Sequence, residues 1–395
     1  MKKKNDVLNE AETVAIITDE ELSETPVKKV HFFSRRQKEE NGEKHHRANE
    51  LSKSAKKSML TRILSAVVGL LIIVPAIFLG DWIYFAIISV ALVIACYEVL
   101  GCTSKRTIVT VLVYFVFVAA IAYWPIFKSL VPSTEQAWNP EILSIGFLYK
   151  QIYLPILVVA VGSFFVFFLT VLYKDFTVHD ACYLIAMAII VGLGFQCLFY
   201  LRYFPNNYPS VPNLKDWQFT VDNTIKPSLL LVFVIFSTFM TDTGAYFVGV
   251  FFGKRKMNER ISPKKTWEGF IGGIIISFLL SSSLALILSS VGWPIYEAYN
   301  PETKEILISF SLYKNWYLIF VLSAIIPLFA TLGDFVFSSI KRYWGIKDYG
   351  KLIPGHGGVL DRLDSIIFAV IVSSIFIHML SSIGVDGFNW AGFLV

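Results

Sequence analysis

A segment that is rich in charge and glycine, residues 338–365, lies between two strongly apolar stretches near the carboxyl end of the chain. It contains several lysines, a Gly-rich turn and the carboxylates Asp361 and Asp364, three residues apart. If a helix begins near Val359, the two carboxylates share one face, and paired carboxylates can bind a hard cation such as Mg2+. The glycines and lysines could hold phosphate groups next to that cation. Because ionisable groups beside apolar spans are candidates for function, the segment indicates an enzyme acting on a lipid phosphate or a nucleotide.

Two further carboxylates lie within the neighbouring apolar stretches. Asp334 precedes Lys341 by seven residues, which is about 10 Å of helix, and Asp242 lies deeper in an earlier stretch. We expect these carboxylates to line one polar cavity that opens to the cytosol. For any single aspartate an internal ion pair is an equal alternative, whereas Asp334, Asp361 and Asp364 together favour metal binding. Hydrogen bonds from nearby threonines are the alternative for Asp242.

Composition places these residues in a membrane protein. The chain has 395 residues, of which 55% are hydrophobic and 16% charged, and its mean hydropathy is +0.60. Soluble domains rarely reach these values, and several apolar runs are long enough to span a bilayer. We therefore predict an all-α, polytopic integral membrane protein with about nine transmembrane helices. The predicted spans cover residues 60–80, 82–100, 107–127, 152–172, 181–201, 227–252, 267–291, 316–340 and 359–381.

The predicted spans divide the chain into three parts. Residues 1–58 are polar and charge-rich, which predicts a disordered cytosolic tail whose basic end touches anionic headgroups. Residues 59–226 hold five amino-terminal spans. Residues 227–395 hold four spans and form the predicted catalytic region, which includes the signature loop 338–365.

Lysine and arginine placement predicts the orientation in the cell membrane. The connecting segments 253–266 and 341–358 carry six and four of these residues, and basic residues concentrate on the cytosolic side. The amino terminus is therefore predicted inside and the carboxyl terminus outside. Glu98, near the cytosolic end of the second span, is expected to extend its carboxylate to water.

A second basic segment precedes the seventh predicted span. Ser262 and Pro263 have the order of a helix start, in which the serine caps free backbone N–H groups. Lys264, Lys265 and Thr266 would then lie at a helix amino terminus, which favours anion binding. Positive-inside topology alone is the alternative. Lys265, like the later Lys341, is expected at the aqueous mouth of the cavity.

These residues resemble the phosphatidate cytidylyltransferase (CDP-diacylglycerol synthase) family. The close resemblance covers about residues 227–381 and includes residues 262–269, Asp242 and the pair Gly333–Asp334. The family's signature pattern is matched by Ser338, Lys341, Arg342, Lys347, Asp348, Gly350, Pro354, His356, Gly357, Gly358, Asp361, Arg362 and Asp364.

The resemblance implies transfer of a cytidylyl group from CTP to phosphatidate, with Mg2+ as cofactor and a second cation as an open alternative. Metal ligands would be Asp334, Asp361 and Asp364, with Asp242 as a weaker candidate. The catalytic set would be Asp334, Asp361, Asp364, Lys341, Arg342 and His356, in which the histidine orients a phosphate or the loop. The substrate-binding set would be Ser262, Lys264, Lys265, Thr266, Lys347, Asp348, Gly357, Gly358 and Arg362. The implied partners are membrane lipids and a second copy of the chain, with which it would form a homodimer. Nucleic acid is not an implied partner.

Three other functions remain as alternatives at this stage. A transporter would carry acidic residues across the bilayer, whereas here the charges gather at one face and no internal repeat is evident. A CDP-alcohol phosphatidyltransferase would need an aspartate array that the chain lacks. A polyprenol kinase would differ in its product, a phosphorylated lipid in place of a CDP-lipid.

Overall fold

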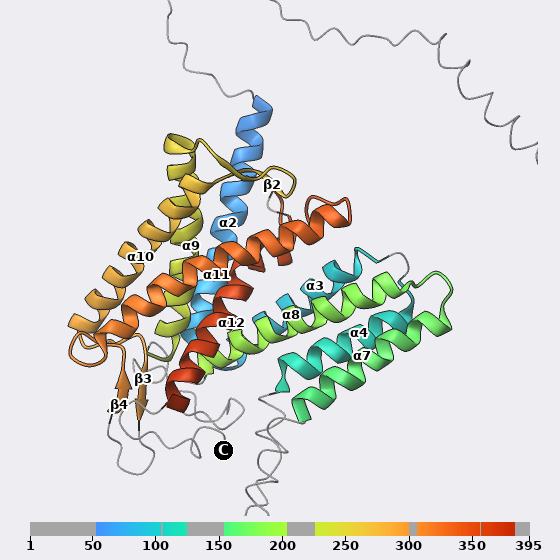
Figure 1. Cartoon of the computed structure of the whole chain (residues 1–395), viewed down its shortest axis with the longest axis horizontal. Helices are drawn as coiled ribbons and strands as arrows, with labels where there is room; N and C mark the ends of the chain where they lie inside the picture. The colour runs from blue at the N-terminus through green and yellow to red at the C-terminus, as the bar shows by residue number, and fades with distance from the viewer. Residues whose placement is uncertain are drawn as a thin grey trace, which may run out of the picture. The chain divides into compact units, whose positions relative to one another are not determined.

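The computed structural model describes residues 53–103, 106–124, 154–203, 226–299, 306–355 and 357–383. The chain divides into two units, Met1–Leu51 and Ser52–Val395, and all described elements lie in the second. Within these ranges the nine predicted helices are confirmed (Figure 1). They are α2 (Lys53–Leu79), α3 (Asp81–Leu100), α4 (Ile108–Ala122), α7 (Leu154–Leu172), α8 (Val178–Tyr203), α9 (Lys226–Phe252), α10 (Trp267–Ser290), α11 (Trp316–Tyr343) and α12 (Leu360–Ile383).

The predicted tail 1–58 falls mostly outside the described residues. Its last part does not, because helix α2 begins at Lys53 and so includes the basic residues that were assigned to the tail. The first helix therefore begins earlier than the hydropathy pattern indicates, although its apolar part begins only at Val67.

In the part of the chain that the structure describes, six helices are long and apolar enough to cross a membrane, and the chain is a polytopic membrane protein. The six segments are Trp82–Leu100, Val178–Arg202, Ser228–Phe252, Trp267–Ser290, Trp316–Tyr343 and Leu360–Leu380. Three shorter apolar helices, Val67–Leu79, Ile108–Ala122 and Ile156–Leu172, accompany them. Many large apolar side chains are exposed on the helices, including Val171 at 78%, as expected for surfaces that face lipid.

The helices pack in two groups that meet along α8 and α12. Helices α3, α4 and α7 pack around α8, while α9 and α11 pack against α12, and α10 packs against α9 and α11 (Figure 1). At the junction, a Cβ on Gly194 of α8 would lie 2.7 Å from Ile367 of α12. The glycine thus allows the two groups to approach closely, and buried Phe195 and Phe337 lie in the shared core.

Helices α9 and α10 pack most closely, through small residues. A Cβ on Gly273 would lie 2.8 Å from the carbonyl oxygen of Thr241, so only glycine fits there. Ser277 donates a hydrogen bond to the Ser237 carbonyl oxygen at 2.7 Å across the same interface. Small residues and interhelical hydrogen bonds are the usual means of helix association in a bilayer. This packing holds the carboxyl-terminal end of α9 beside the start of α10.

Two short antiparallel hairpins interrupt the all-α pattern. Strand β1 (Lys256–Asn258) pairs with β2 (Ser262–Thr266), and β3 (Glu297–Tyr299) pairs with β4 (Ile306–Ser309). The predicted helix start at Ser262 is therefore wrong, because Ser262–Thr266 is a strand. Helix α10 begins at Trp267, and its N-cap is Thr266, whose hydroxyl accepts from Gly269 N at 3.2 Å. Serine before proline also suits an extended segment, since the residue before proline avoids helical backbone angles.

Candidate active site

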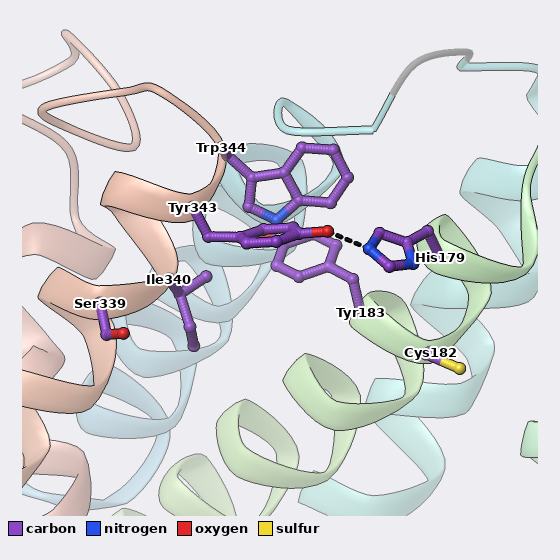
Figure 2. Close-up of a pocket in the computed structure, with 7 residues that line it drawn as sticks. All are labelled: His179, Cys182, Tyr183, Ser339, Ile340, Tyr343 and Trp344. Atoms are coloured by element: carbon purple, nitrogen blue, oxygen red, sulfur yellow. Dashed lines mark hydrogen bonds between the residues drawn. The ribbon is translucent and has the colours of Figure 1, made fainter.

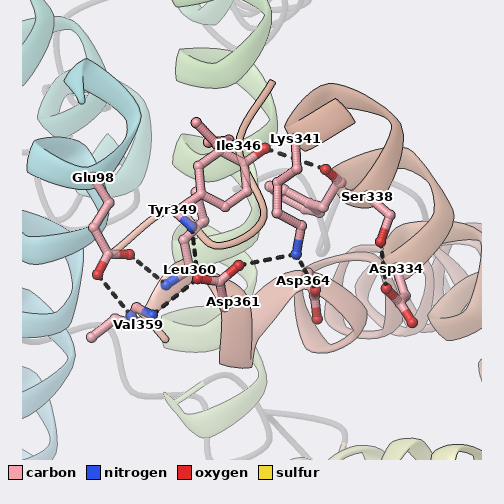
Figure 3. Close-up of polar contacts among 12 residues, drawn as sticks. Glu98, Asp334, Ser338, Lys341, Ile346, Tyr349, Val359, Leu360, Asp361 and Asp364 are labelled. Atoms are coloured by element: carbon pink, nitrogen blue, oxygen red, sulfur yellow. Dashed lines mark hydrogen bonds and ion pairs between the residues drawn. The ribbon is translucent and has the colours of Figure 1, made fainter. Parts of the chain in front are cut away.

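The signature loop connects α11 to α12, and a glycine sets how closely these helices approach. A Cβ on Gly333 would lie 2.7 Å from the carbonyl oxygen of Asp364 and 2.9 Å from Phe368. Glycine at this position brings the adjacent Asp334 of α11 beside the first turns of α12. The carboxylates of both helices therefore lie in one region (Figure 3).

A buried lysine joins the two helices within this region. The Lys341 Nζ lies 3.0 Å from Asp361 Oδ1 and 3.5 Å from Asp364 Oδ2. The side chains of Lys341 and Asp361 are 9% and 3% exposed. The prediction that Lys341 lies at an aqueous mouth is therefore wrong. Because α12 brings two carboxylates to the inner face of α11, the lysine can be buried with its charge compensated.

Asp361 also fixes the backbone of the α11–α12 connection, residues 344–359. Its Oδ2 accepts from Tyr349 N at 2.8 Å and from Gly358 N at 2.9 Å. Tyr349 is itself a buried residue of the connection, and burial is the main cause that raises the pKa of its hydroxyl. The predicted phosphate contact of Gly358 does not use its N–H here, because that group already binds Asp361.

Glu98 of α3 completes this arrangement from the other helix group. Its carboxylate accepts from Val359 N at 2.9 Å and from Leu360 N at 2.8 Å, at the start of α12 (Figure 3). Glu98 is only 5% exposed, so the expectation that it extends to water is wrong. The cause is a long-range one: α12 presents free N–H groups to α3, and a carboxylate satisfies them. The only sequence signal was an acidic residue close to the end of an apolar span.

A second lysine–aspartate pair lies nearer the surface. Lys265 of β2 forms an ion pair with Asp334, and their side chains are 27% and 24% exposed. The Lys265 Nζ also lies 4.6 Å from the ring centroid of Phe335. Ser338 donates to Asp334 Oδ1 at 3.1 Å. The hairpin thus brings a lysine to the carboxylate that lies four residues before the signature loop.

Electrostatic interactions extend the site to α9. Asp242 interacts with Lys265, Asp334 and Arg362, and Asp364 interacts with both Asp242 and Asp334. Residues from α9, β2, α11 and α12 therefore act on one another in a single charged cluster. The charged cluster comprises Asp242, Lys265, Asp334, Lys341, Asp361, Arg362 and Asp364, and all of these are predicted site residues.

The three predicted metal ligands are not gathered around one point. Among the described residues, no group of three or more His, Cys, Asp or Glu side chains could hold a metal ion. Asp361 fits the role least, because it is the most buried of the three and its Oδ2 already binds two backbone N–H groups. Asp334 and Asp364 also have partners on both oxygens: Lys265 and Ser338 bind Asp334, and Lys341 and Ser365 N bind Asp364. Asp334 and Asp364 would hold Mg2+ where it displaces these lysines, since proteins commonly hold this ion with one or two carboxylates while substrate phosphates supply further ligands.

The remaining predicted residues lie around this cluster. Arg342 is exposed and donates to two backbone carbonyl oxygens, of Ile261 and Ile346, both at 3.3 Å. It therefore ties the β1–β2 hairpin to the α11–α12 connection. Gly357 has a φ of 88° and its carbonyl oxygen accepts from Ile353 N. The side chains of Lys264, Lys347, Asp348 and Arg362 are exposed, and His356 lies outside the described residues.

A groove of about 400 Å³ lies on a different face of α11 from the charged cluster. Figure 2 shows Tyr343 and Trp344 at the end of α11 facing the first turns of α8, where the Tyr343 hydroxyl is hydrogen-bonded to His179. Its lining residues are His179, Cys182, Tyr183, Ser339, Ile340, Tyr343 and Trp344. None of these is a predicted site residue.

Comparison with known proteins gives the class of the chain. Residues 60–380, which include every residue of the charged cluster, match the model of the cytidylyltransferase family. The chain belongs to the cytidylyltransferase family.

Similar curated proteins share one name. A phosphatidate cytidylyltransferase of Staphylococcus haemolyticus is 29% identical over 313 residues, which cover 79% of this chain and 96% of the relative. The phosphatidate cytidylyltransferases of Staphylococcus epidermidis and Staphylococcus aureus are each 28% identical, over 313 and 314 residues, with the same coverage.

Proposed function

We propose that this chain transfers a cytidylyl group from CTP to phosphatidate and forms CDP-diacylglycerol and pyrophosphate. The observation that carries the proposal is the family match over residues 60–380, which spans the whole charged cluster. The shared name of the relatives supports the choice of phosphatidate as acceptor.

The reaction needs positioning and charge compensation more than a general base. A phosphate oxygen of phosphatidate is already ionised at neutral pH, and it attacks the α-phosphorus of CTP. The new phosphorus–oxygen bond forms as the bond from the α-phosphorus to the oxygen of the leaving pyrophosphate breaks. Both substrates are anionic, so fixed cations at the site lower the barrier by holding them together.

The proposed roles follow from the two lysine–aspartate pairs. Lys265, being partly exposed and paired with Asp334, is positioned to exchange its partner for a substrate phosphate. Lys341 is buried and holds Asp361 and Asp364 in place, so its role is internal to the site. Asp334 and Asp364 would hold Mg2+, which when bound withdraws charge from phosphate oxygens. Lys264, Lys347 and Arg362 are further candidates for phosphate contact, since their side chains are exposed around the cluster.

The finer architecture remains part of the proposal. We assign nine transmembrane spans, a polar cavity that opens to the cytosol, a cytosolic amino terminus and an external carboxyl terminus. The homodimer is proposed from the family resemblance. Labelling of single cysteines placed at Asn258 and Asn389 tests the topology, because the two positions must react from opposite sides of the membrane.

The proposed activity is tested with the purified full chain, CTP, phosphatidate and Mg2+. Formation of CDP-diacylglycerol together with pyrophosphate is the expected result. A phosphorylated lipid and CDP from a polyprenol substrate would instead identify a lipid kinase. Substrate uptake into proteoliposomes without any CDP-lipid would identify a transporter and would overturn the proposal.

A further inference from the structure

The Glu98 carboxylate is unusual among the acidic groups near the site, because its partners are backbone atoms alone. It is 5% exposed and accepts from Val359 N and Leu360 N. Within the described ranges it takes part in no ion pair. Burying an unpaired carboxylate is costly, and here two charge-assisted hydrogen bonds and the amino terminus of α12 offset that cost.

The α11–α12 connection is shaped around this carboxylate. Gly350 and Gly358 both contact it, and a Cβ on Gly350 would lie 2.5 Å from Glu98 Oε1 and 3.0 Å from Cδ. Neither glycine has a positive φ, so the close approach of Glu98 explains why a side chain does not fit. Two separate parts of the connection therefore touch a residue of the amino-terminal helix group.

Glu98 and Asp361 divide three consecutive N–H groups between them. Gly358 N binds Asp361, while the next two N–H groups bind Glu98. Asp361 in turn binds the buried Lys341, which contacts Asp364. A shift of Glu98 therefore moves the start of α12 and, through it, the lysine and carboxylates of the charged cluster.

We propose that Glu98 is a positioning residue for cytidylyl transfer: it sets the start of α12, and thereby the geometry of Lys341, Asp361 and Asp364, from outside the signature segment. The inference rests on the proposed function. A displacement of catalytic groups by about 1 Å can reduce turnover by roughly 100-fold. Glu98→Gln keeps one acceptor oxygen but turns an amide N–H toward a backbone N–H, so one of the two hydrogen bonds is lost.

The test compares Glu98→Gln with Asp180→Asn in the purified full-length enzyme. Asp180 is a matched control because it is also a buried carboxylate at a helix start, where its Oδ2 accepts from Thr177 N at 3.0 Å. Two quantities are measured for each folded protein: kcat and KM for CTP, and the rate of tryptic cleavage after the exposed Lys347 and Lys351. Proteolysis reports the connection without requiring activity, so it remains informative if the wild-type chain proves to have another activity.

Glu98→Gln is expected to lower kcat by roughly 10- to 100-fold and to accelerate cleavage after Lys347 and Lys351. Asp180→Asn should lower the melting temperature while its kcat stays within about twofold of wild type. Should Glu98→Gln fail to fold, Gly350→Ala tests the same contact, because the added Cβ presses on the Glu98 carboxylate. Gly350→Ala is expected to lower kcat. In the double variant Gly350→Ala/Glu98→Asp, the shorter carboxylate side chain should restore part of that lost kcat. Unchanged kcat and cleavage in the folded Glu98 variant, or no restoration in the double variant, overturns the proposal.

Discussion

Two lysine–aspartate pairs in this protein consist of the same residue types but differ in burial and in their other partners. Lys341 and Asp361 are 9% and 3% exposed, and the second oxygen of the aspartate binds backbone N–H groups. Lys265 and Asp334 are 27% and 24% exposed, and the other oxygen of the aspartate accepts only from a serine hydroxyl. The buried pair cannot release its partners without leaving charges unpaired in the interior. The exposed pair can, and under the proposed function this difference separates a lysine that holds the site together from a lysine that is available to substrate.

The largest effect is expected on the carboxylates that face the proposed metal. Asp334→Asn and Asp364→Asn should each lower turnover by about 100- to 1,000-fold, the scale of a lost transition-state charge contact. The double variant should cost little more than either single one, because the groups act as a unit. Turnover is measured at saturating CTP and Mg2+, with exposed Glu259→Gln on the β1–β2 turn as control. Full activity in either single variant would remove that residue from the site.

Loss of the buried lysine should appear first as loss of stability. Lys341→Ala leaves Asp361 and Asp364 without their cation, and breaking a buried pair in this way costs about 3–5 kcal/mol. Chemical unfolding in detergent, followed by tryptophan fluorescence, measures this change in the free energy of unfolding. A variant as stable as wild type would show that Lys341 belongs with the exposed lysine.

Loss of the exposed lysine should have the opposite profile. Lys265→Ala is expected to change the free energy of unfolding by less than about 1 kcal/mol, as is usual for a partly exposed ion pair. Turnover should nevertheless fall by roughly tenfold or more, since a phosphate contact is removed. Steady-state kinetics and the same unfolding assay decide this prediction. A large stability loss with normal turnover of the folded fraction would contradict it.

Substitutions at the start of α10 should have a smaller effect on stability, and they distinguish the predicted cap, Ser262, from the observed cap, Thr266. Thr266→Ala removes the hydroxyl that accepts from Gly269 N and should cost about 1 kcal/mol of stability. Ser262→Ala should cost less, because Ser262 lies in strand β2. Melting temperatures of the two variants, with Thr266→Ser as the conservative control, provide the comparison. Equal losses would restore Ser262 as a cap.

The smallest effect is expected at the amino terminus. Deletion of residues 1–50 should leave turnover in detergent unchanged, because the family match begins only at residue 60. Turnover per folded enzyme is measured for the truncated chain beside the full one. A collapse of turnover would place the tail in the site.

The features that the sequence predicted correctly are those that depend on local composition. Hydropathy located the nine helices, and the signature pattern located the α11–α12 connection together with Lys341 and Asp361, although not the ion pair between them. Composition and spacing report the local solvent preference of a segment, which the bilayer makes unusually strong. The catalytic assignments remain predictions.

Errors arose where a distant segment decides the outcome. Ser262–Thr266 is a strand because Lys256–Asn258 pairs with it, and that pairing is not visible in the serine–proline order. Lys341 is buried because α12 places two carboxylates against it. Glu98 accepts hydrogen bonds from the backbone of Val359 and Leu360 at the start of α12, and these residues lie 261 and 262 positions later in the chain. No pattern within a short window contains these partners.

The separation between Glu98 and α12 has a consequence for biogenesis. Helix α3 is synthesised long before α12, so a nascent chain carries the Glu98 carboxylate into the membrane without its final partners. Contacts between residues so far apart form late, since the intervening chain must first be brought together. The contacts of Glu98 with α12 can therefore form only after the last described helix has been made. A translation product that lacks α12 would hold most of the described helices and yet would lack Asp361 and Asp364 of the charged cluster.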